Sequence, residues 1–164
     1  MSTSQYTIQP VRPTDVPAVV SMVYELAEFE QAPDECHLTE DQLHAALFGP
    51  SPALFGHVAF DATGEPVGMM LWFLNFSTWE GQHGIYLEDL YVRPHARGTG
   101  LGKQMLATLA QFCVDRGYPR LQWWVLHWNP ARDFYAAMGS VPMDEWIVYR
   151  MSGAALAKLG EASD

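Results

Sequence analysis

The residues most suited to chemistry lie in one segment, LEDLYVRPHARGTGLGKQML, at positions 87–106. It opens with an apolar run that contains two adjacent acids, Glu88 and Asp89, and that stops at a proline. A turn with three glycines follows, and then the beginning of a helical pattern. Glycines let a backbone turn tightly, and the first turn of a helix presents unpaired N–H donors. The segment therefore predicts an anion-binding turn between a strand and a helix.

Two familiar phosphate-binding loops do not fit these glycines. A Walker A loop needs Gly at position 97 and Ser or Thr at position 104, where the chain has Arg97 and Gln104. The dinucleotide fingerprint G-x-G-x-x-G, begun at Gly98, needs a third glycine where Lys103 stands. The remaining pattern is R-x-x-G-x-G, in which Arg97 and Lys103 add full charges to the partial charge of the helix end. It predicts a binding site for a diphosphate.

The elements that position this segment follow from hydrophobic periodicity and turn residues. In chain order the pattern predicts a first strand near 6–10, a helix from Thr14 or Asp15 to about Glu30, a short helix from Thr39 to Gly49, strands over 53–61, 66–77 and 85–92, a helix over 100–116, a strand over 120–128, a short helix over 130–139 and a last strand over 145–151. This order predicts an α+β fold with a mixed sheet, in one domain over residues 1–164.

Composition and charge narrow the possible function classes. The chain has 164 residues, is 49% hydrophobic and has a net charge of −10. No apolar run is long enough to span a membrane, and the acidic balance argues against sequence-independent nucleic-acid binding. Residues 1–92 contain thirteen acids and one basic residue, whereas residues 93–164 contain eight basic residues and six acids. This distribution indicates either a solvated acidic surface or a protein that binds a cation with the first half of its chain and an anion with the second half.

Cysteines, histidines and the N-terminus bear on location and metal binding. Two cysteines far apart in the sequence, and an N-terminus without the regions of a secretion signal, favour a cytoplasmic protein. The six histidines form no HxxxH or HxH pair, so no metal site is expected.

On these residues the chain resembles the GCN5-related N-acetyltransferase (GNAT) superfamily, and within it the diamine (spermidine/spermine) N-acetyltransferases. The similar segments are IQPVRPTD at the start, ELAEFE at 25–30, LTEDQL at 38–43, YLEDLYV at 86–92, RGTGLG at 97–102, WN at 128–129, FY at 134–135 and EW at 145–146. The resemblance implies a GNAT fold with a splayed central sheet flanked by helices. It also implies an enzyme that transfers an acetyl group from acetyl-CoA to a primary amine of a small cationic acceptor, either a polyamine or diamine or a lysine-like amino acid. Relatives in this branch are homodimers, so a homodimer is expected.

The resemblance also assigns the acetyl-CoA contacts. The glycine turn would hold the pyrophosphate, and the strand before it would pair with the pantetheine arm and orient the thioester. Asn129 matches a position that contacts CoA or the strand end in relatives. The implied cofactor-binding residues are Leu90, Tyr91, Val92, Arg97, Gly98, Thr99, Gly100, Leu101, Gly102, Lys103 and Asn129.

Two residues match the catalytic positions of the family. An ammonium ion must lose a proton before its nitrogen attacks, and Glu88 matches the carboxylate that takes this proton directly or through water. Tyr135 matches the tyrosine that donates a proton to the leaving thiolate, and a phenol stays protonated at neutral pH. Without the resemblance, the alternative interpretation is that Glu88 is a surface acid on a half-exposed strand and that Tyr135 is an aromatic residue of the core. The segment NPARDFY is one residue shorter than the usual family spacing, which leaves open where the helix carrying Tyr135 begins.

A cationic acceptor needs acids for its charges and aromatic rings for its alkyl parts. The resemblance places three acids nearest the acceptor: Glu30, Glu88 and Asp89. The candidate aromatic residues to line its channel are Phe29, Trp79, Trp124 and Trp146, of which Phe29 and Trp124 are predicted to contact the acceptor. Two alternatives remain open, a non-catalytic acyl-CoA-binding regulatory domain and a protein or peptide N-acetyltransferase. The pair Glu88 and Tyr135 favours an enzyme, because a protein that only binds acyl-CoA needs neither residue.

Overall fold

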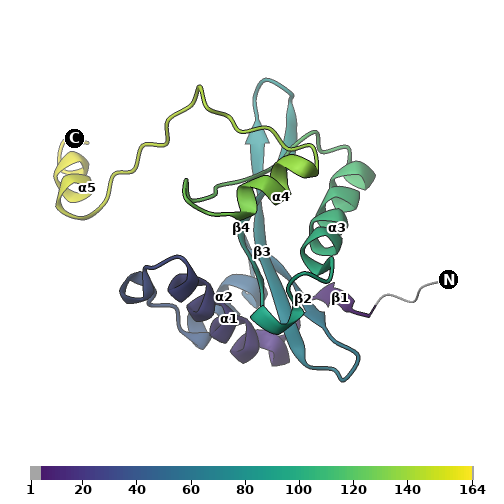
Figure 1. Cartoon of the computed structure of the whole chain (residues 1–164). Coiled ribbons are helices and arrows are strands. Elements are labelled where there is room, and N and C mark those ends of the chain that lie inside the picture. Colours follow the sequence, from purple (N-terminus) through teal and green to yellow (C-terminus); the bar gives the residue numbers. More distant parts are fainter. Residues whose placement is uncertain (1–4, 164) are drawn as a thin grey trace. The chain divides into compact units, whose positions relative to one another are not determined.

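The computed structural model describes residues 5–163, which are drawn in colour in Figure 1. They divide into two compact units, a first unit that ends at Leu126 and a second unit that begins at His127. The expectation of one domain over residues 1–164 therefore stays a prediction. No helix among residues 5–163 is long and apolar enough to cross a membrane.

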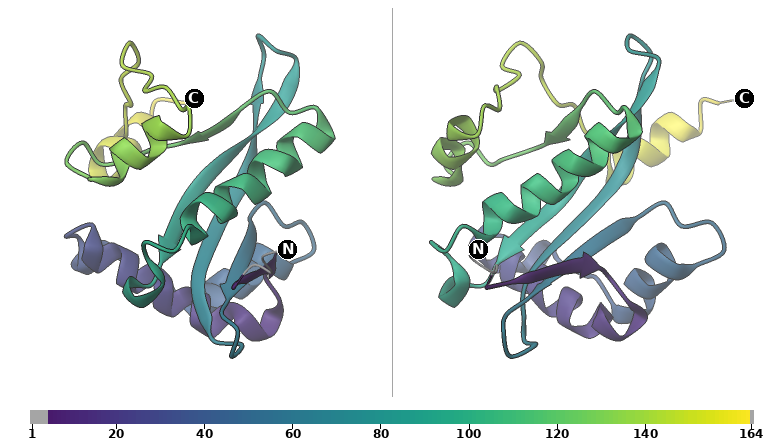
Figure 2. Two further views of the ribbon diagram at one scale, coloured as in Figure 1. Left: turned by 45° about the vertical axis from the view of Figure 1, so that its right-hand side comes forward. Right: turned by 90° about the vertical axis from the view of Figure 1, so that its right-hand side faces the viewer.

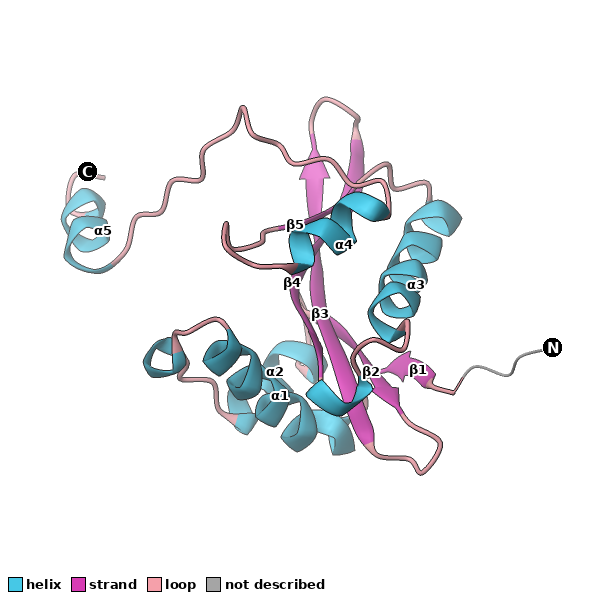
Figure 3. Cartoon of the chain, in the orientation of Figure 1, coloured by secondary structure: helices cyan, strands magenta, loops and turns pink. Residues whose placement is uncertain are grey.

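The first unit is built on one five-stranded sheet (Figure 3). Its strands lie in the order in which they follow in the chain: β1 (Thr7–Pro10), β2 (Phe55–Phe60), β3 (Pro66–Ser77), β4 (Gln82–Val92) and β5 (Leu121–Trp123). Neighbours up to β4 are antiparallel, and β4 and β5 are parallel. The predicted mixed sheet is confirmed, and the strand predicted over 66–77 has these same bounds.

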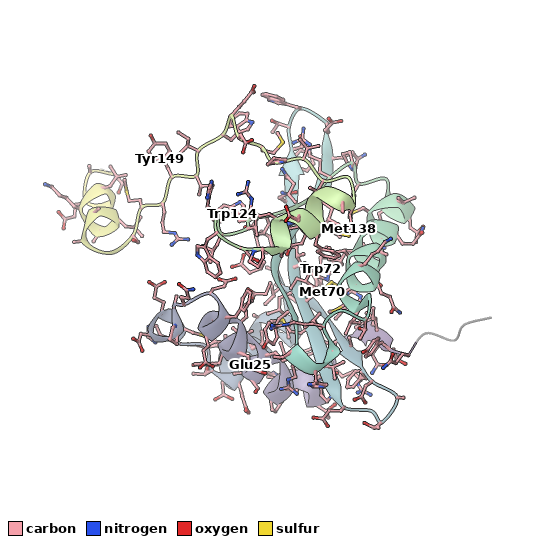
Figure 4. The ribbon with its side chains drawn as sticks, in the orientation of Figure 1. Glu25, Met70, Trp72, Trp124, Met138 and Tyr149 are labelled. Atoms are coloured by element: carbon pink, nitrogen blue, oxygen red, sulfur yellow. The ribbon has the colours of Figure 1, made fainter. Side chains whose placement is uncertain are left out.

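Helices cover both faces of this sheet. The α-helices of this unit are α1 (Val16–Phe29), α2 (Glu40–Phe48) and α3 (Leu101–Arg116). Its short 3-10 turns are η1 (Pro13–Asp15), η2 (Pro33–Glu35) and η3 (Pro94–Ala96). Figure 2 shows α1 and α2 on one side of the sheet and α3 on the other. Because side chains alternate along a strand, β3 supplies both cores. Met69 and Leu71 pack with α1 and α2. Trp72, whose position Figure 4 marks, contacts Phe112 of α3 with 5.0 Å between ring centroids.

The second unit contains α4 (Ala131–Ala137) and α5 (Gly153–Gly160). Two strand predictions are wrong, one at the end of the first unit and one in the second unit. The strand predicted over 120–128 ends at Trp123, and residues 145–151 form no strand. An apolar run shows that a segment can be buried, but a strand also needs a hydrogen-bonded neighbour, and within residues 5–163 neither 124–128 nor 145–151 has one. Helix α5 was not predicted.

Local sequence fixes the start of α2. The Thr39 hydroxyl accepts a hydrogen bond from the Gln42 N–H at 3.2 Å, and the Gln42 side chain accepts one from the Thr39 N–H at 3.1 Å. This reciprocal pair satisfies two donors that the helix itself leaves unpaired, and it lies at the residue where the sequence predicted the helix to begin.

We expect Thr39→Ala to lower the free energy of unfolding by about 1 kcal/mol, because the cap bond is lost. Thr108→Ala on α3 is the matched control. Its hydroxyl bonds to the Gln104 carbonyl within a helix, so a change to the better helix former is expected to be near neutral. Urea unfolding measures both, and equal effects of the two changes would contradict the capping role.

Candidate active site

The glycine turn joins η3 to α3. Gly98 and Gly100 have φ of 75° and 87°, a left-handed backbone that residues with a Cβ rarely adopt. Apart from the adjoining residues, no heavy atom of residues 5–163 lies within 4 Å of the position that a Cβ would take at either glycine. These glycines are therefore needed for the path of the chain and not for space. The Thr99 hydroxyl donates to the Ala96 carbonyl at 2.6 Å and holds the turn from within.

The turn leaves the N-terminal end of α3 open. Gly100 precedes the helix without a side-chain cap, and the first bond of the helix runs from Gln104 N–H to Gly100 O at 3.0 Å. The N–H groups of Leu101, Gly102 and Lys103 consequently have no acceptor within the helix. Leu101 has a buried side chain, so only its backbone can meet a ligand. Unpaired donors, the helix dipole and Lys103 make this end suited to an anion.

Arg97 connects the turn to β4. Its Nε donates to the Val92 carbonyl at 2.8 Å, and its guanidinium lies over the rings of Phe29 and Tyr91, 5.2 and 5.4 Å from their centroids. The sequence predicted Arg97 as a phosphate ligand and Phe29 as an acceptor contact. The structure places the two against each other, so Arg97 also fixes the turn between α1 and the end of β4.

Among the residues that the structure describes, β4 beyond its first half pairs with a strand on one side only. It pairs with β3 as far as Val92 but with β5 only over Ile85–Leu87, which is the splay that the family resemblance implies. Arg93 N–H donates to Val67 O of β3 at 2.8 Å. By strand alternation the backbone groups of Leu90 and Val92 then point away from β3, toward the open edge, whereas those of Tyr91 point toward β3. The open edge can accept an extended ligand as an added strand.

A bulge in β4 positions the two acids. Leu71 of β3 lies opposite Asp89, and Trp72 lies opposite Leu87, so Glu88 has no residue opposite it. In a regular strand Glu88 and Asp89 would point to opposite faces. Here Glu88 is exposed and Asp89 is half-buried, and their charges still interact.

The acids form a cluster with Glu30 from the end of α1. Burial, together with the smaller effects of the Glu88 and Glu30 charges, raises the pKa of Asp89 to about 7. Burial also raises the pKa of Glu30. Within residues 5–163 no ion pair joins a basic side chain to any of the three. The cluster is therefore an uncompensated negative site, suited to a cation.

Tyr86 belongs to this cluster and was missed in the sequence. Burial, with Glu88 and Asp89, raises its pKa to about 12, so it stays protonated at neutral pH. Its ring makes an edge-on contact with Trp124, with 5.6 Å between centroids. The available signal was its place on the strand, two residues before Glu88.

The second unit carries Asn129 and Tyr135. Asn129 Oδ1 accepts the Ala131 N–H at 2.9 Å and so opens α4. The shorter spacing noted in the sequence thus still gives a helix that contains Tyr135. The Tyr135 carbonyl accepts the Ser140 hydroxyl at 2.6 Å, and its ring lies 5.5 Å from that of Phe134, which fixes the residue at the end of the helix.

Comparisons with known proteins agree with this geometry. A model of the acetyltransferase (GNAT) family matches residues 20–139. The chain belongs to this family. Thialysine N-epsilon-acetyltransferases of Bos taurus and Caenorhabditis elegans are each 36% identical to it, covering 93% and 95% of this chain and 95% and 98% of their own length. A solved integron cassette protein from the mobile metagenome of V. cholerae matches with a TM-score of 0.80 and 25% identity, over 97% of this chain and 99% of that one.

Family membership makes the chain an N-acetyltransferase, and GNAT acetyltransferases use acetyl-CoA as a substrate. The open end of α3 and the open edge of β4 fit its phosphates and its extended arm. Among residues 5–163 no group of three or more His, Cys, Asp or Glu side chains could hold a metal ion. The absence of a metal from the GNAT reaction here stays a prediction.

We expect Gly100→Ala to weaken acetyl-CoA binding by about tenfold or more, because the turn must leave its left-handed conformation. Gly117→Ala is the matched control, since Gly117 has φ of 70° and open space around it at the other end of α3. Both changes should cost about 1 kcal/mol of stability. Calorimetric titration with acetyl-CoA should separate them, and equal affinities would contradict the phosphate site.

A second prediction concerns Asp89. Its pKa is raised from 3.8 in the folded protein, so its contribution to stability is present below pH 4 and is lost as the pH rises through about 7. We expect the wild type to lose on the order of 1 kcal/mol between pH 5 and 8 relative to Asp89→Asn, the shift being reduced by solvent screening.

Urea unfolding at several pH values checks this. Glu88→Gln removes one of the charges that raise the Asp89 pKa. The folded-state pKa of Asp89 should then be lower, so the loss of stability should end at a lower pH and be smaller. A wild-type profile unchanged in Asp89→Asn would show that this carboxylate is not the titrating group.

Proposed function

We propose that the chain acetylates the primary amine of a small cationic acceptor, a lysine-like amino acid or a diamine, with acetyl-CoA as donor. The observation that carries the proposal is the arrangement on β4, where the bulged acid pair adjoins an open strand edge that ends at the glycine turn. The relatives named for the N-epsilon amine of thialysine support an acceptor with an amine at the end of a chain.

In this proposal the donor is held by backbone. The diphosphate binds at the N–H groups that open α3, with Lys103 beside them. The pantetheine arm adds to the open edge of β4 at Leu90 and Val92, as a strand adds to a sheet. An N–H of this edge stabilises the oxyanion that forms on the thioester carbonyl when the amine attacks.

The acid cluster receives the acceptor. Asp89 and Glu30 bind the ammonium groups, and the rings of Tyr86 and Trp124 contact the alkyl chain. Glu88, exposed at the bulge, takes the proton from the attacking nitrogen directly or through water. A bound cation lowers the pKa of Asp89 and stabilises its charged form.

The leaving thiolate needs a proton. Tyr135 supplies it in this proposal, because a phenol is protonated at neutral pH and its position matches the family tyrosine. Both cysteines, Cys36 and Cys113, are free thiols, which supports the reducing cytoplasm that we propose as its location. We also propose a homodimer.

Turnover of acetyl-CoA, followed by release of free thiol, tests the acceptor class. The panel contains lysine and thialysine, diamines and polyamines, aminoglycosides and short peptides. We expect kcat/KM to be highest for acceptors with a primary amine at the end of a short chain and a second charge. Preference for peptides or aminoglycosides would overturn the acceptor assignment, and no thiol release with any amine would overturn the activity.

We expect Tyr135→Phe to lower kcat at least about tenfold while acetyl-CoA affinity changes by less than a few fold, because only proton donation is lost. Tyr24→Phe is the control, since it removes a hydroxyl that donates to the Leu38 carbonyl at 2.9 Å on the outside of α1. Unchanged kcat in Tyr135→Phe would remove this residue as the acid.

A further inference from the structure

Arg93 lies at the junction between the open edge of β4 and the glycine turn. β4 ends at Val92 and η3 begins at Pro94, so Arg93 is the one residue between them. Its N–H donates to the Val67 carbonyl of β3 at 2.8 Å, and its own carbonyl accepts the Ala96 N–H at 2.9 Å. The backbone of Arg93 is therefore bonded to the sheet on one side and to the turn on the other.

The side chain of Arg93 joins the same point to α1 and to the start of β3. Its Nε and Nη2 donate to Oε2 of Glu25, which Figure 4 labels, at 3.2 and 3.1 Å, and its Nη1 donates to the Pro66 carbonyl at 2.9 Å. Nη1 also lies 3.8 Å from Glu65 Oε1. The side chains of Arg93 and Glu25 are 19% and 33% exposed, so this charge-assisted contact is partly shielded from water. All three guanidinium nitrogens thus donate to protein oxygens.

The other polar contacts of the turn fix its shape more than its place. The Arg97 N–H donates to the Pro94 carbonyl at 3.2 Å, and the Thr99 hydroxyl donates within the turn as well. The buried side chains of Ala96 and Leu101 hold the turn against the first unit, but apolar contacts have no preferred direction. The direction of the turn therefore depends on the bonds of the residue that precedes it.

Two contacts link this junction to α1, the Arg93–Glu25 pair and the contact of Arg97 with the Phe29 ring. Arg97 is also the residue expected to meet the phosphates of the donor. The Arg93–Glu25 pair is consequently the link to α1 that can stay in place when the donor binds.

Acetyl-CoA needs the strand edge and the turn in one fixed relation. In the proposed function the pantetheine arm pairs with Leu90 and Val92 while the diphosphate meets the N–H groups that open α3. Both contacts form together only if the chain changes direction correctly at Arg93. A misplacement of about 1 Å in groups of this kind can cost on the order of a hundredfold.

We propose that Arg93 is a positioning residue for acetyl-CoA, whose bonds to Glu25 and Pro66 hold the glycine turn where the diphosphate and the pantetheine arm can bind together. It acts through the turn, because its guanidinium nitrogens are already engaged by protein oxygens. The inference rests on the proposed function, in which the diphosphate of the donor binds at this turn.

Calorimetric titration with acetyl-CoA is the first test. We expect Arg93→Met to raise the dissociation constant about tenfold, because the turn loses its bonds to α1 and β3. Arg93→Lys keeps the charge with one nitrogen in place of three, so it should recover part of the affinity. Arg120→Met is the matched control, since Arg120 pairs with Glu80 at 3.6 Å near the other end of β4. It should change the affinity by less than about twofold.

The stoichiometry of the titration separates this effect from a loss of folded protein. Unfolding lowers the number of binding sites and leaves the affinity of the folded fraction unchanged. Equal affinities of the wild type and Arg93→Met would overturn the inference.

The second test separates position from charge. Glu25→Met removes the partner of Arg93 and, with it, a negative charge. If Arg93 holds the turn in place, Glu25→Met should weaken acetyl-CoA binding about threefold or more, because the guanidinium loses its link to α1. If Arg93 only attracted phosphates by its charge, the same change should tighten binding.

Glu28→Met is the control for this second test. Glu28 is exposed on the same helix and forms no ion pair within residues 5–163, so its loss should not weaken binding. A Glu25→Met protein that binds acetyl-CoA as tightly as the wild type, or more tightly, would show that the pair does not position the turn.

Steady-state kinetics give a third readout, with the amine that performs best in the acceptor panel. In Arg93→Met the KM for acetyl-CoA should rise, whereas kcat at saturating donor and the KM for the amine should stay within about threefold. A fall in kcat with an unchanged KM for acetyl-CoA would contradict the positioning role.

The outcomes also separate this inference from the proposed function. A wild type that does not bind acetyl-CoA overturns both. An affinity that falls in Gly100→Ala but not in Arg93→Met supports the donor site and overturns only the role of Arg93.

Discussion

The structure depends on one break in hydrogen bonding, the point after Leu87 where β4 loses its neighbour β5 but keeps β3. Backbone N–H and C=O groups inside a sheet are normally all paired, and an edge that is left open needs another partner. Val92 O finds one in Arg97, while Leu90 faces outward from the same edge. Because α3 begins just beyond this edge, unpaired backbone groups of a strand and of a helix end lie in sequence along one path. That path suits a ligand with an extended arm and a diphosphate.

The bulge at Glu88 is required by the same geometry. Ile85 N–H donates to Arg120 O beside β5, whereas Arg93 N–H donates to Val67 O of β3. The two donors are eight residues apart, an even number, so in a regular strand they would point to the same side. They point to opposite sides, and one extra residue must lie between them. A single inserted position therefore both turns the backbone of Leu90 toward the open edge and places the acid pair.

Sequence reasoning could predict the features that depend on a few residues close together in the sequence. The glycine turn, the start of a helix at Thr39 and the helix predicted over 100–116 each need particular residues at short spacing. The bulge could not be predicted, because no glycine or proline marks it. The extra residue is recognised only from the sides to which the Ile85 and Arg93 N–H groups point, and these are known only when both neighbours of β4 are known. Residues 145–151 were predicted as a strand from their apolar run, and this was wrong, because an apolar pattern does not provide the hydrogen-bonded neighbour that a strand needs. Arg97 was predicted to face a ligand, but its inward bond to Val92 depends on how the turn folds.

The acid cluster shows how this fold favours a charged acceptor. Asp89 is half-buried, and the charges of Glu30 and Glu88 act on it. Arg93, on the same segment of chain, forms ion pairs with Glu25 and Glu65 instead. The carboxylates therefore repel one another in the free protein, and this repulsion raises the cost of ionising Asp89. An ammonium ion removes that cost when it binds, whereas a neutral molecule of the same shape does not. By linkage, binding of the cation and loss of the Asp89 proton must favour each other equally. In the proposed function the cluster thus selects for charge before any contact with the rest of the acceptor is made.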